Sequence, residues 1–161
     1  PIYPEEYENG KVIAHPAWLH GLENARAGIM MPATPATGTP DYAQGWGPAV
    51  GWTDRAKVDS MGVRRCVPVD CYDDVVVMAE TSQSEVDAQQ LKYYARGVGN
   101  IYTGWRGAGE KVKETLALAK VEQLDANRLA EVRAKALELE KSAYKNSKKL
   151  YGKTAPAQPM K

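Results

Sequence analysis

The two cysteines of the chain, Cys66 and Cys71, lie close together in the segment CVPVDC. In an oxidising compartment such a pair can close a small loop across a turn if the two Cα atoms approach closely enough. Two free thiols are the competing interpretation. A metal role is a third, although two cysteines alone do not complete a zinc site and the two histidines are distant in sequence. We therefore treat Cys66 and Cys71 as a candidate disulfide.

His15 and His20 flank the segment PAWL, and Met30 and Met31 follow a short distance later. Imidazole and thioether groups are ligands for a soft metal such as copper. The alternative is a pair of loop histidines that make ordinary hydrogen bonds, and this is the interpretation we adopt. No metal site and no cofactor are predicted, and copper binding is kept as a secondary hypothesis.

Carboxylates are plentiful in the middle of the chain, but their spacing predicts no acid–base pair. The ones considered are Asp54, Asp59, Asp70, Asp73, Asp74 and Glu80. The nucleophile elbow G-x-S-x-G, the zinc motif H-E-x-x-H and a Cys–His signature are all missing from the sequence. We therefore expect a protein that is not an enzyme.

The stretch LKYYARGVGNIYTGWRG, residues 91 to 107, is rich in glycine and aromatic residues. A phosphate-binding loop needs its glycines between a strand and the start of a helix. Here the segment GVGN is followed by IYTGW, which alternates as a strand does. The pattern favours a bent β-hairpin, with Gly97 and Gly99 at a bulge or sharp bend.

Aromatic side chains are the remaining candidates for a binding site, because the chain has nine Tyr and four Trp but no Phe. They could line an apolar groove, or they could form the core or a lid over it. The candidate ligand-binding residues are Trp18, Trp46, Trp52, Tyr94, Tyr102 and Trp105.

The elements that would position these residues are mostly strands. Asn9-Gly10 predicts a type I′ turn between strands at 5–8 and 11–14. Residues 15–52 are rich in Gly, Pro, Ala and Thr and predict a long ordered excursion across a sheet face. Further strands are expected at about 53–60, 73–81, on both sides of the 97–99 bend, and at 113–121. Val75 to Val77 predict a strand that is covered on both faces.

The C-terminal part changes to a helical pattern over residues 125–152. Asp125 is a plausible N-cap, apolar residues recur at three- and four-residue steps, and Gly152 is a natural stop. We expect this helix to pack on the sheet, and residues 153–161 to form a loose tail. The predicted fold is therefore α+β: a sheet domain over 1–124, a curved antiparallel meander resembling a half-barrel, with one long C-terminal helix.

Composition limits the possible partners. The chain has 161 residues and a formal net charge of +1, whereas a nucleic-acid binder usually carries a basic surplus. No run of about 18 apolar residues occurs, so no membrane span is expected. No signal peptide is visible, and the chain reads as a mature or trimmed product.

Four segments together resemble a family of bacterial secreted or lipoprotein-like proteins of uncharacterised function. They are EEYENGKV, ARAGIMMPATPATGTPDY, DRAKV before CYDDVVVMAETS, and LKYYARGVGNIYTGW, and the match covers roughly residues 3 to 121. Relatives usually have Pro where Arg96 stands, and a more acidic loop where this chain has Gly51-Trp52-Thr53. The resemblance implies an export signal upstream, sheet strands that precede Pro1, and a periplasmic or extracellular location. It carries over no catalytic residue.

These observations lead to an exported, non-enzymatic binding protein as the main hypothesis. Its concave sheet face, under the 15–52 excursion, would hold an apolar or amphipathic small molecule or lipid. The outline is similar to that of periplasmic lipid-carrier half-barrels, an analogy of fold alone. The alternative is a structural or interaction subunit of an envelope assembly, which would dock a protein partner through the helix or an open sheet edge.

Overall fold

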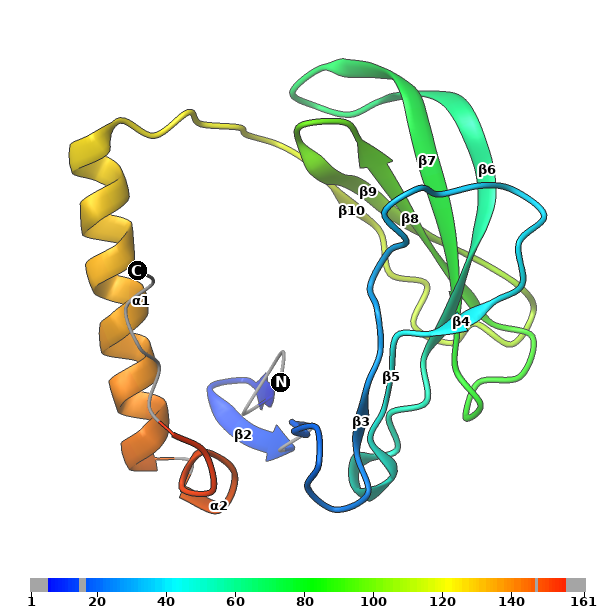
Figure 1. Cartoon of the computed structure of the whole chain (residues 1–161). Helices are drawn as coiled ribbons and strands as arrows, with labels where there is room; N and C mark the ends of the chain where they lie inside the picture. Colours follow the sequence, from blue (N-terminus) through cyan, green and yellow to red (C-terminus); the bar gives the residue numbers. More distant parts are fainter. Residues whose placement is uncertain (1–5, 15–16, 147, 156–161) are drawn as a thin grey trace. The chain divides into compact units, whose positions relative to one another are not determined.

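The structure, a computed structural model, describes residues 6–14, 17–146 and 148–155 (Figure 1). The chain divides into two compact units, one made of His20–Val121 and the other of Pro1–Leu19 with Glu122–Lys161. Each unit is described by itself. Within the described residues, no helix has the length and apolar character needed to cross a membrane.

The first unit is an antiparallel sheet with strand order β10-β9-β8-β7-β6-β4, accompanied by a small β3–β5 pair. The elements are β3 (Arg26–Ala27), β4 (Tyr42–Ala43), β5 (Gly45–Trp46), the 3-10 turn η1 (Pro48–Val50), β6 (Arg55–Cys66), β7 (Cys71–Thr81), β8 (Gln89–Ala95), β9 (Gly99–Arg106) and β10 (Leu116–Ala117). Neighbouring strands from β6 to β10 are consecutive in the chain, so the predicted meander is confirmed. The α+β class is confirmed as well.

Two local predictions fare differently. The glycine-rich stretch is a β-hairpin, as expected: Gly97 and Gly99 have φ values of 76° and 104°, and β9 rather than a helix follows. The strand expected at 113–121 is wrong in extent, because only β10 pairs with β9. Lys113, the first residue of the expected strand, has a φ of 51°, which lies in the left-handed region and interrupts an extended strand.

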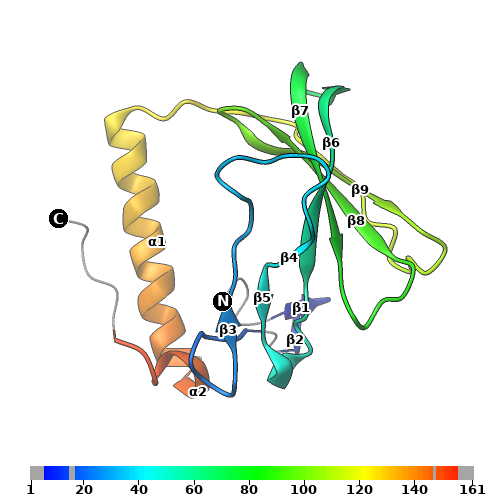
Figure 2. The same cartoon turned by 45° about the vertical axis from the view of Figure 1, so that its right-hand side comes forward.

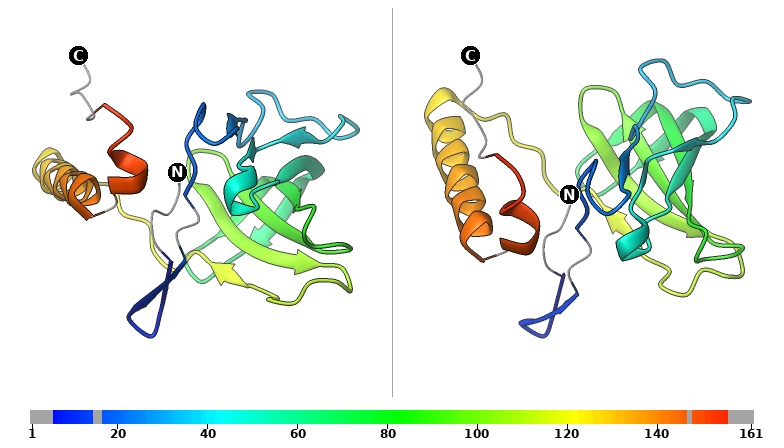
Figure 3. Two further views of the ribbon diagram at one scale, coloured as in Figure 1. Left: turned by 90° about the horizontal axis from the view of Figure 1, so that it is seen from below. Right: turned by 60° about the horizontal axis from the view of Figure 1, so that its bottom comes forward.

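Both faces of β7 are covered, as its valine run predicts. On one face, called the inner face here, Val75 packs with Ala95 and Ile101, and Tyr93 and Tyr102 lie against this cluster. The Arg65 guanidinium of β6 lies 3.5 Å from the Tyr102 ring centroid on β9. Because β6 and β9 are separated by two strands in the sheet, this contact requires the sheet to bend toward the inner face (Figure 3).

On the opposite, outer face, Met78 packs with Ala56 and Val58. Met31 and Tyr42 of the 15–52 excursion lie against this cluster. Figure 2 shows the path of this part of the chain through β3, β4 and β5. The expectation that the excursion lies over the concave face is therefore corrected for residues 20–52, because Met31 and Tyr42 pack on the outer face. The reason lies in the sequence of β7, where Met78 alternates with Val75 and Val77 and offers the outer face an apolar platform of its own.

The β6–β7 hairpin ends in a disulfide between Cys66 and Cys71, whose Cα atoms are 3.9 Å apart. The two cysteines are register partners at the last rung of the ladder. Val67 donates its backbone N–H to the Asp70 carbonyl across the turn at 2.9 Å. The disulfide therefore closes the end of the longest hairpin in the described sheet.

The second unit contains a hairpin and a helix. Strands β1 (Glu6–Glu8) and β2 (Lys11–Ala14) pair around Asn9 and Gly10, which have φ values of 50° and 75°, as the turn prediction requires. Helix α1 (Ala126–Asn146) is followed by α2 (Lys148–Tyr151). The Asp125 side chain accepts the Arg128 N–H at 2.8 Å and caps the helix as predicted. Packing of this helix on the sheet stays a prediction, and residues 156–161 of the tail lie outside the described residues.

Candidate functional site

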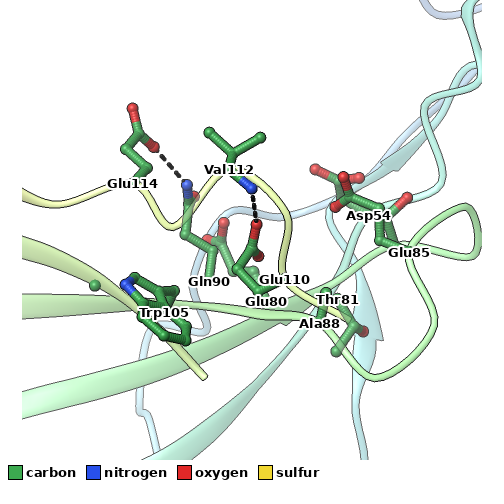
Figure 4. Close-up of a pocket in the computed structure, with 12 residues that line it drawn as sticks. Asp54, Glu80, Thr81, Glu85, Ala88, Gln90, Trp105, Glu110, Val112 and Glu114 are labelled. Atoms are coloured by element: carbon green, nitrogen blue, oxygen red, sulfur yellow. Dashed lines mark hydrogen bonds between the residues drawn. The ribbon is translucent and has the colours of Figure 1, made fainter. Parts of the chain in front are cut away.

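A pocket of about 240 Å³ lies on the outer face, at the end of the sheet where β7 leads into β8 (Figure 4). Carboxylates dominate its walls, and one tryptophan adds an aromatic surface. No lysine or arginine is among the described residues that line it. The side chains that define its chemistry are Asp54, Glu80, Glu85, Glu110, Glu114 and Trp105.

Strand register brings the floor of the pocket together. Glu80 of β7 is directly opposite Gln90 of β8, and Gln90 is opposite Trp105 of β9. Directly opposed residues of an antiparallel pair point to the same face, so these three side chains form a row across three strands. The row continues to Ala56 of β6, which is the register partner of Glu80.

The outer wall is formed by residues 107–114, called the strap here. Its start is fixed against the β7–β8 loop, because Ala108 and Gly109 donate their N–H groups to Asp87 at 3.1 and 2.9 Å. The approach is so close that a Cβ atom on Gly107 or Gly109 would overlap the backbone of this loop. Glycine is therefore needed at both positions.

The strap is also fixed at its other end. Gln90 donates to the Glu114 carboxylate at 2.7 Å, which ties the strap to β8. Within the strap, Glu110 accepts the N–H groups of Val112 and Lys113 at 3.0 and 3.4 Å. Figure 4 shows Glu110, Val112 and Glu114, which all belong to the strap, along one side of the pocket.

Glu80 is the buried charge of the site, with its side chain only 7% exposed. It forms an ion pair with Lys92 at 2.6 Å and accepts a hydrogen bond from Gln44 at 2.7 Å. Gln44 also donates to the Met30 carbonyl at 3.2 Å, as does the Tyr42 hydroxyl at 3.0 Å. Glu80 therefore anchors the 15–52 excursion to the sheet while it lines the pocket.

Asp54 lies at one end of the pocket beside Glu85, and Trp105 lies at the other (Figure 4). Burial raises the pKa of the Asp54 carboxyl above its ordinary value of 3.8, and the negative charge of Glu80 raises it further. A carboxylate in this position is stabilised by an incoming cation, because the cation offsets both causes of the shift.

Trp105 is 40% exposed and is covered in part by a side chain of the strap. The Lys113 ammonium lies 4.9 Å from the indole centroid, which is the geometry of a cation–π contact. The chain therefore places one of its own cations on the aromatic wall of an acidic pocket.

The six aromatic residues selected from the sequence do not form one surface. Trp105 lines the pocket, whereas Tyr94 packs on the outer cluster and Tyr102 on the inner one. Trp46 on β5 is exposed, and Trp52 is half-buried beside it at the Gly47–Trp52 bridge. Trp18 belongs to the other unit. Alternation along a strand separates side chains that a sequence places close together.

The copper hypothesis receives no support from the placement of its residues. His20 accepts the Ala27 N–H at 3.1 Å, which is the ordinary hydrogen bond expected for a loop histidine. Met30 is exposed, Met31 packs on the outer cluster, and His15 lies outside the described residues. Across the described part of the chain, no three His, Cys, Asp or Glu side chains are placed to hold a metal ion.

In the sequence, Asp54 and Glu80 are carboxylates whose spacing predicts no acid–base pair, and no pattern there marks Glu85, Glu110 or Glu114 as site residues. Their convergence depends on β-strand register and on the path of the strap. Gly107 and Gly109 are the signal that could have located the strap, because two glycines after an aromatic strand mark a close backbone approach.

Comparisons with protein-family models, with curated proteins and with solved structures find no match for this chain. The resemblance to a secreted family therefore stays a prediction.

Proposed function

We propose that this protein is an exported, non-enzymatic binding protein whose pocket on the outer face takes a small amphipathic organic cation. The single observation that carries the proposal is a cavity that combines carboxylates with an exposed tryptophan face. The ligand would place its ammonium or amidinium group among the carboxylates and its apolar part on Trp105.

The charge of the pocket favours a cation. Of the five carboxylates that line it, Glu80 is neutralised by Lys92, and Glu114 accepts a hydrogen bond from the neutral Gln90. Asp54 and Glu85 have no ion pair with a basic side chain among the ion pairs found in the described residues. Negative charges in a partly enclosed site attract a positively charged group and disfavour an anion.

The aromatic wall favours an organic rather than an inorganic cation. An indole face binds cations and flat apolar groups, and the interaction is worth about 0.5–1 kcal/mol at exposed sites and about 2 kcal/mol when desolvated. Pockets of this kind combine an apolar surface with a few charged groups that orient the ligand. The amphipathic ligand expected from the sequence is retained, but its site moves from the concave inner face to the outer face.

The disulfide supports the proposed location outside the cytosol, because such bonds persist in oxidising compartments. Mass spectrometry of the natural protein, alkylated without reduction, tests this part separately. Two alkylated cysteines would contradict an exported, oxidised protein.

Binding can be tested with phenethylammonium and its neutral analogue 2-phenylethanol, which have similar size and the same ring. We expect phenethylammonium to bind with a Kd of about 1 mM or tighter, corresponding to about −4 kcal/mol. The alcohol should bind at least about tenfold more weakly, and phenylacetate should not bind. Titration followed by two-dimensional NMR of the full chain measures all three. Equal affinity for the amine and the alcohol would contradict the cation proposal.

Variants locate the site. Trp105→Ala and Glu85→Gln should each weaken phenethylammonium binding by about threefold to tenfold, because each removes one part of the recognition. Asp74→Asn is the matched control, since it removes one exposed negative charge from the β6–β7 hairpin and leaves the pocket intact. If Asp74→Asn weakens binding as much as Glu85→Gln does, net charge rather than the pocket determines the affinity.

A second candidate function is assembly through the open edge of the sheet. In the described structure β4 pairs with only Arg55 and Ala56 of β6. Residues 57–66 of β6 therefore pair with β7 on one side and have no strand on the other side within the described sheet unit. An edge of this kind accepts a strand from a second copy of the chain. Size-exclusion chromatography with light scattering tests it, and a monomer at high concentration would rule this candidate out.

A further inference from the structure

We propose that Lys113 is a built-in competitor that covers the tryptophan wall of the pocket until a cationic ligand displaces it. The inference rests on the proposed function and adds a regulatory device to the same site. It predicts that, without ligand, the Lys113 ammonium lies over the Trp105 ring, where the cation or the ring of the ligand would bind.

The contact itself is the first argument. The Lys113 ammonium lies 4.9 Å from the Trp105 centroid, within the range in which a cation is attracted to an aromatic face. Trp105 belongs to β9 and lines the pocket, whereas Lys113 belongs to the strap, whose Glu110, Val112 and Glu114 line the same pocket. The pair therefore joins the strap to the tryptophan wall. A ligand that stacks on Trp105 must move the lysine side chain aside.

The backbone of the strap directs Lys113 to this position. Its φ of 51° is a left-handed conformation that a lysine adopts only at a cost. The Glu110 side chain accepts the N–H groups of Val112 and Lys113, and Glu114 is held by Gln90. The strap is therefore fixed on both sides of Lys113, while the lysine residue itself is exposed.

The neighbouring lysine provides the contrast needed to test this. Lys111 lies on the same strap and is also exposed, so its positive charge acts on the same acidic pocket. The cation–π contacts of the described residues include Lys113 and Arg65 but not Lys111. Removing either lysine raises the negative potential of the pocket, but only removal of Lys113 uncovers Trp105.

The first experiment measures the contact without any ligand. The indole N–H resonance of Trp105 is assigned in the full chain by its loss in Trp105→Phe and is then compared among variants. Lys113→Ala should shift this resonance, and Lys111→Ala should leave it close to the wild-type position. An unchanged resonance in Lys113→Ala would show that the lysine does not cover the ring in solution.

The second experiment measures competition with phenethylammonium as the probe. Lys113→Ala should bind it about threefold to tenfold more tightly than the wild-type chain, because no internal cation has to be displaced. Lys111→Ala should give a smaller gain that disappears in high salt, since it acts through long-range charge alone. Lys113→Arg should restore the wild-type affinity, because arginine keeps a cation over the ring.

The outcomes separate this inference from the function on which it rests. If the wild-type chain binds phenethylammonium and Lys113→Ala binds it equally well or more weakly, the competitor role is wrong while the binding function stands. If neither the wild-type chain nor Lys113→Ala binds the probe, the proposed function fails and the competitor role fails with it.

Discussion

The two faces of the sheet differ in how their side chains pack. On the inner face, Arg65 reaches from β6 to Tyr102 on β9, and Arg106 of β9 forms an ion pair with Asp59 of β6 at 2.6 Å. On the outer face the strands carry an apolar platform at one end and the acidic pocket at the other. The inner face is filled by its own side chains, and the outer face keeps a cavity.

The direction of bending explains this difference. A sheet that bends brings the side chains of its concave face together, so that even strands with two others between them make contact. The Nε atom of Arg65 is buried there and makes no hydrogen bond within the described structure. On the outer face side chains diverge, and loops must supply the walls of any cavity. Here the β7–β8 loop and the strap supply them.

The largest expected effect tests whether the inner face provides the stability. Ile101 is 1% exposed within the inner cluster. Ile101→Ala should lower the free energy of unfolding by about 3 kcal/mol, because it removes buried methyl groups and leaves a cavity. Urea denaturation measures the loss. Phenethylammonium binding should be unchanged at temperatures where this variant is folded, and a parallel loss of binding would show that the two faces are not independent.

A second substitution tests the buried charge of the outer face. Lys92→Met removes the ion-pair partner of Glu80, which stays buried with the hydrogen bond from Gln44 but without a positive charge beside it. Breaking a fully buried pair costs about 3–5 kcal/mol, and the partial exposure of Lys92 reduces the expected loss to about 2 kcal/mol.

The double variant Lys92→Met/Glu80→Gln is the matched control. A glutamine at position 80 can still pair with Gln44 and carries no charge, so it should recover most of the lost stability. A double variant no more stable than Lys92→Met would show that the ammonium matters for reasons other than neutralising Glu80. Both free energies of unfolding come from the same urea titrations.

Much of the fold follows from local sequence signals. Asn9-Gly10 determines a turn through backbone conformations that few other residues adopt, and Asp125 begins a helix by accepting an N–H group. The valine run of β7 indicates coverage on both faces. These features depend on residues that are neighbours in the chain, and sequence patterns report such features well.

Most of the candidate site could not be predicted from the sequence, because its residues are distant from one another in the chain. Asp54 and Glu80 come together because β6 and β7 pair in one particular register, and Glu110 joins them through the path of the strap. The candidate aromatic residues do not lie together, because Tyr94 packs on the outer cluster and Tyr102 on the inner one. Such convergence depends on register and loop path, which composition and short motifs do not determine.

The last prediction, smallest in size, concerns the free-energy cost of keeping a carboxyl in the pocket. The pKa of Asp54 is raised in the folded chain by burial and then by Glu80, so the folded state binds its proton more tightly than the unfolded state does. Stability therefore falls as the pH rises from 3.8 through the raised pKa. Asp54→Asn should be more stable than the wild-type chain at neutral pH, and the gain should vanish below pH 3.8. Thermal unfolding across this pH range measures it.

The same substitution should weaken phenethylammonium binding, so its effects on stability and on affinity have opposite signs. Asp59→Asn on the inner face is the matched control, because it breaks the ion pair with Arg106. We expect it to lower stability by about 0.5 kcal/mol and to leave binding unchanged. If Asp54→Asn instead lowers stability at neutral pH, the half-buried carboxylate is a structural group like Asp59. The carboxylates of the outer face would then stabilise the fold, as those of the inner face do, although the outer face has a cavity.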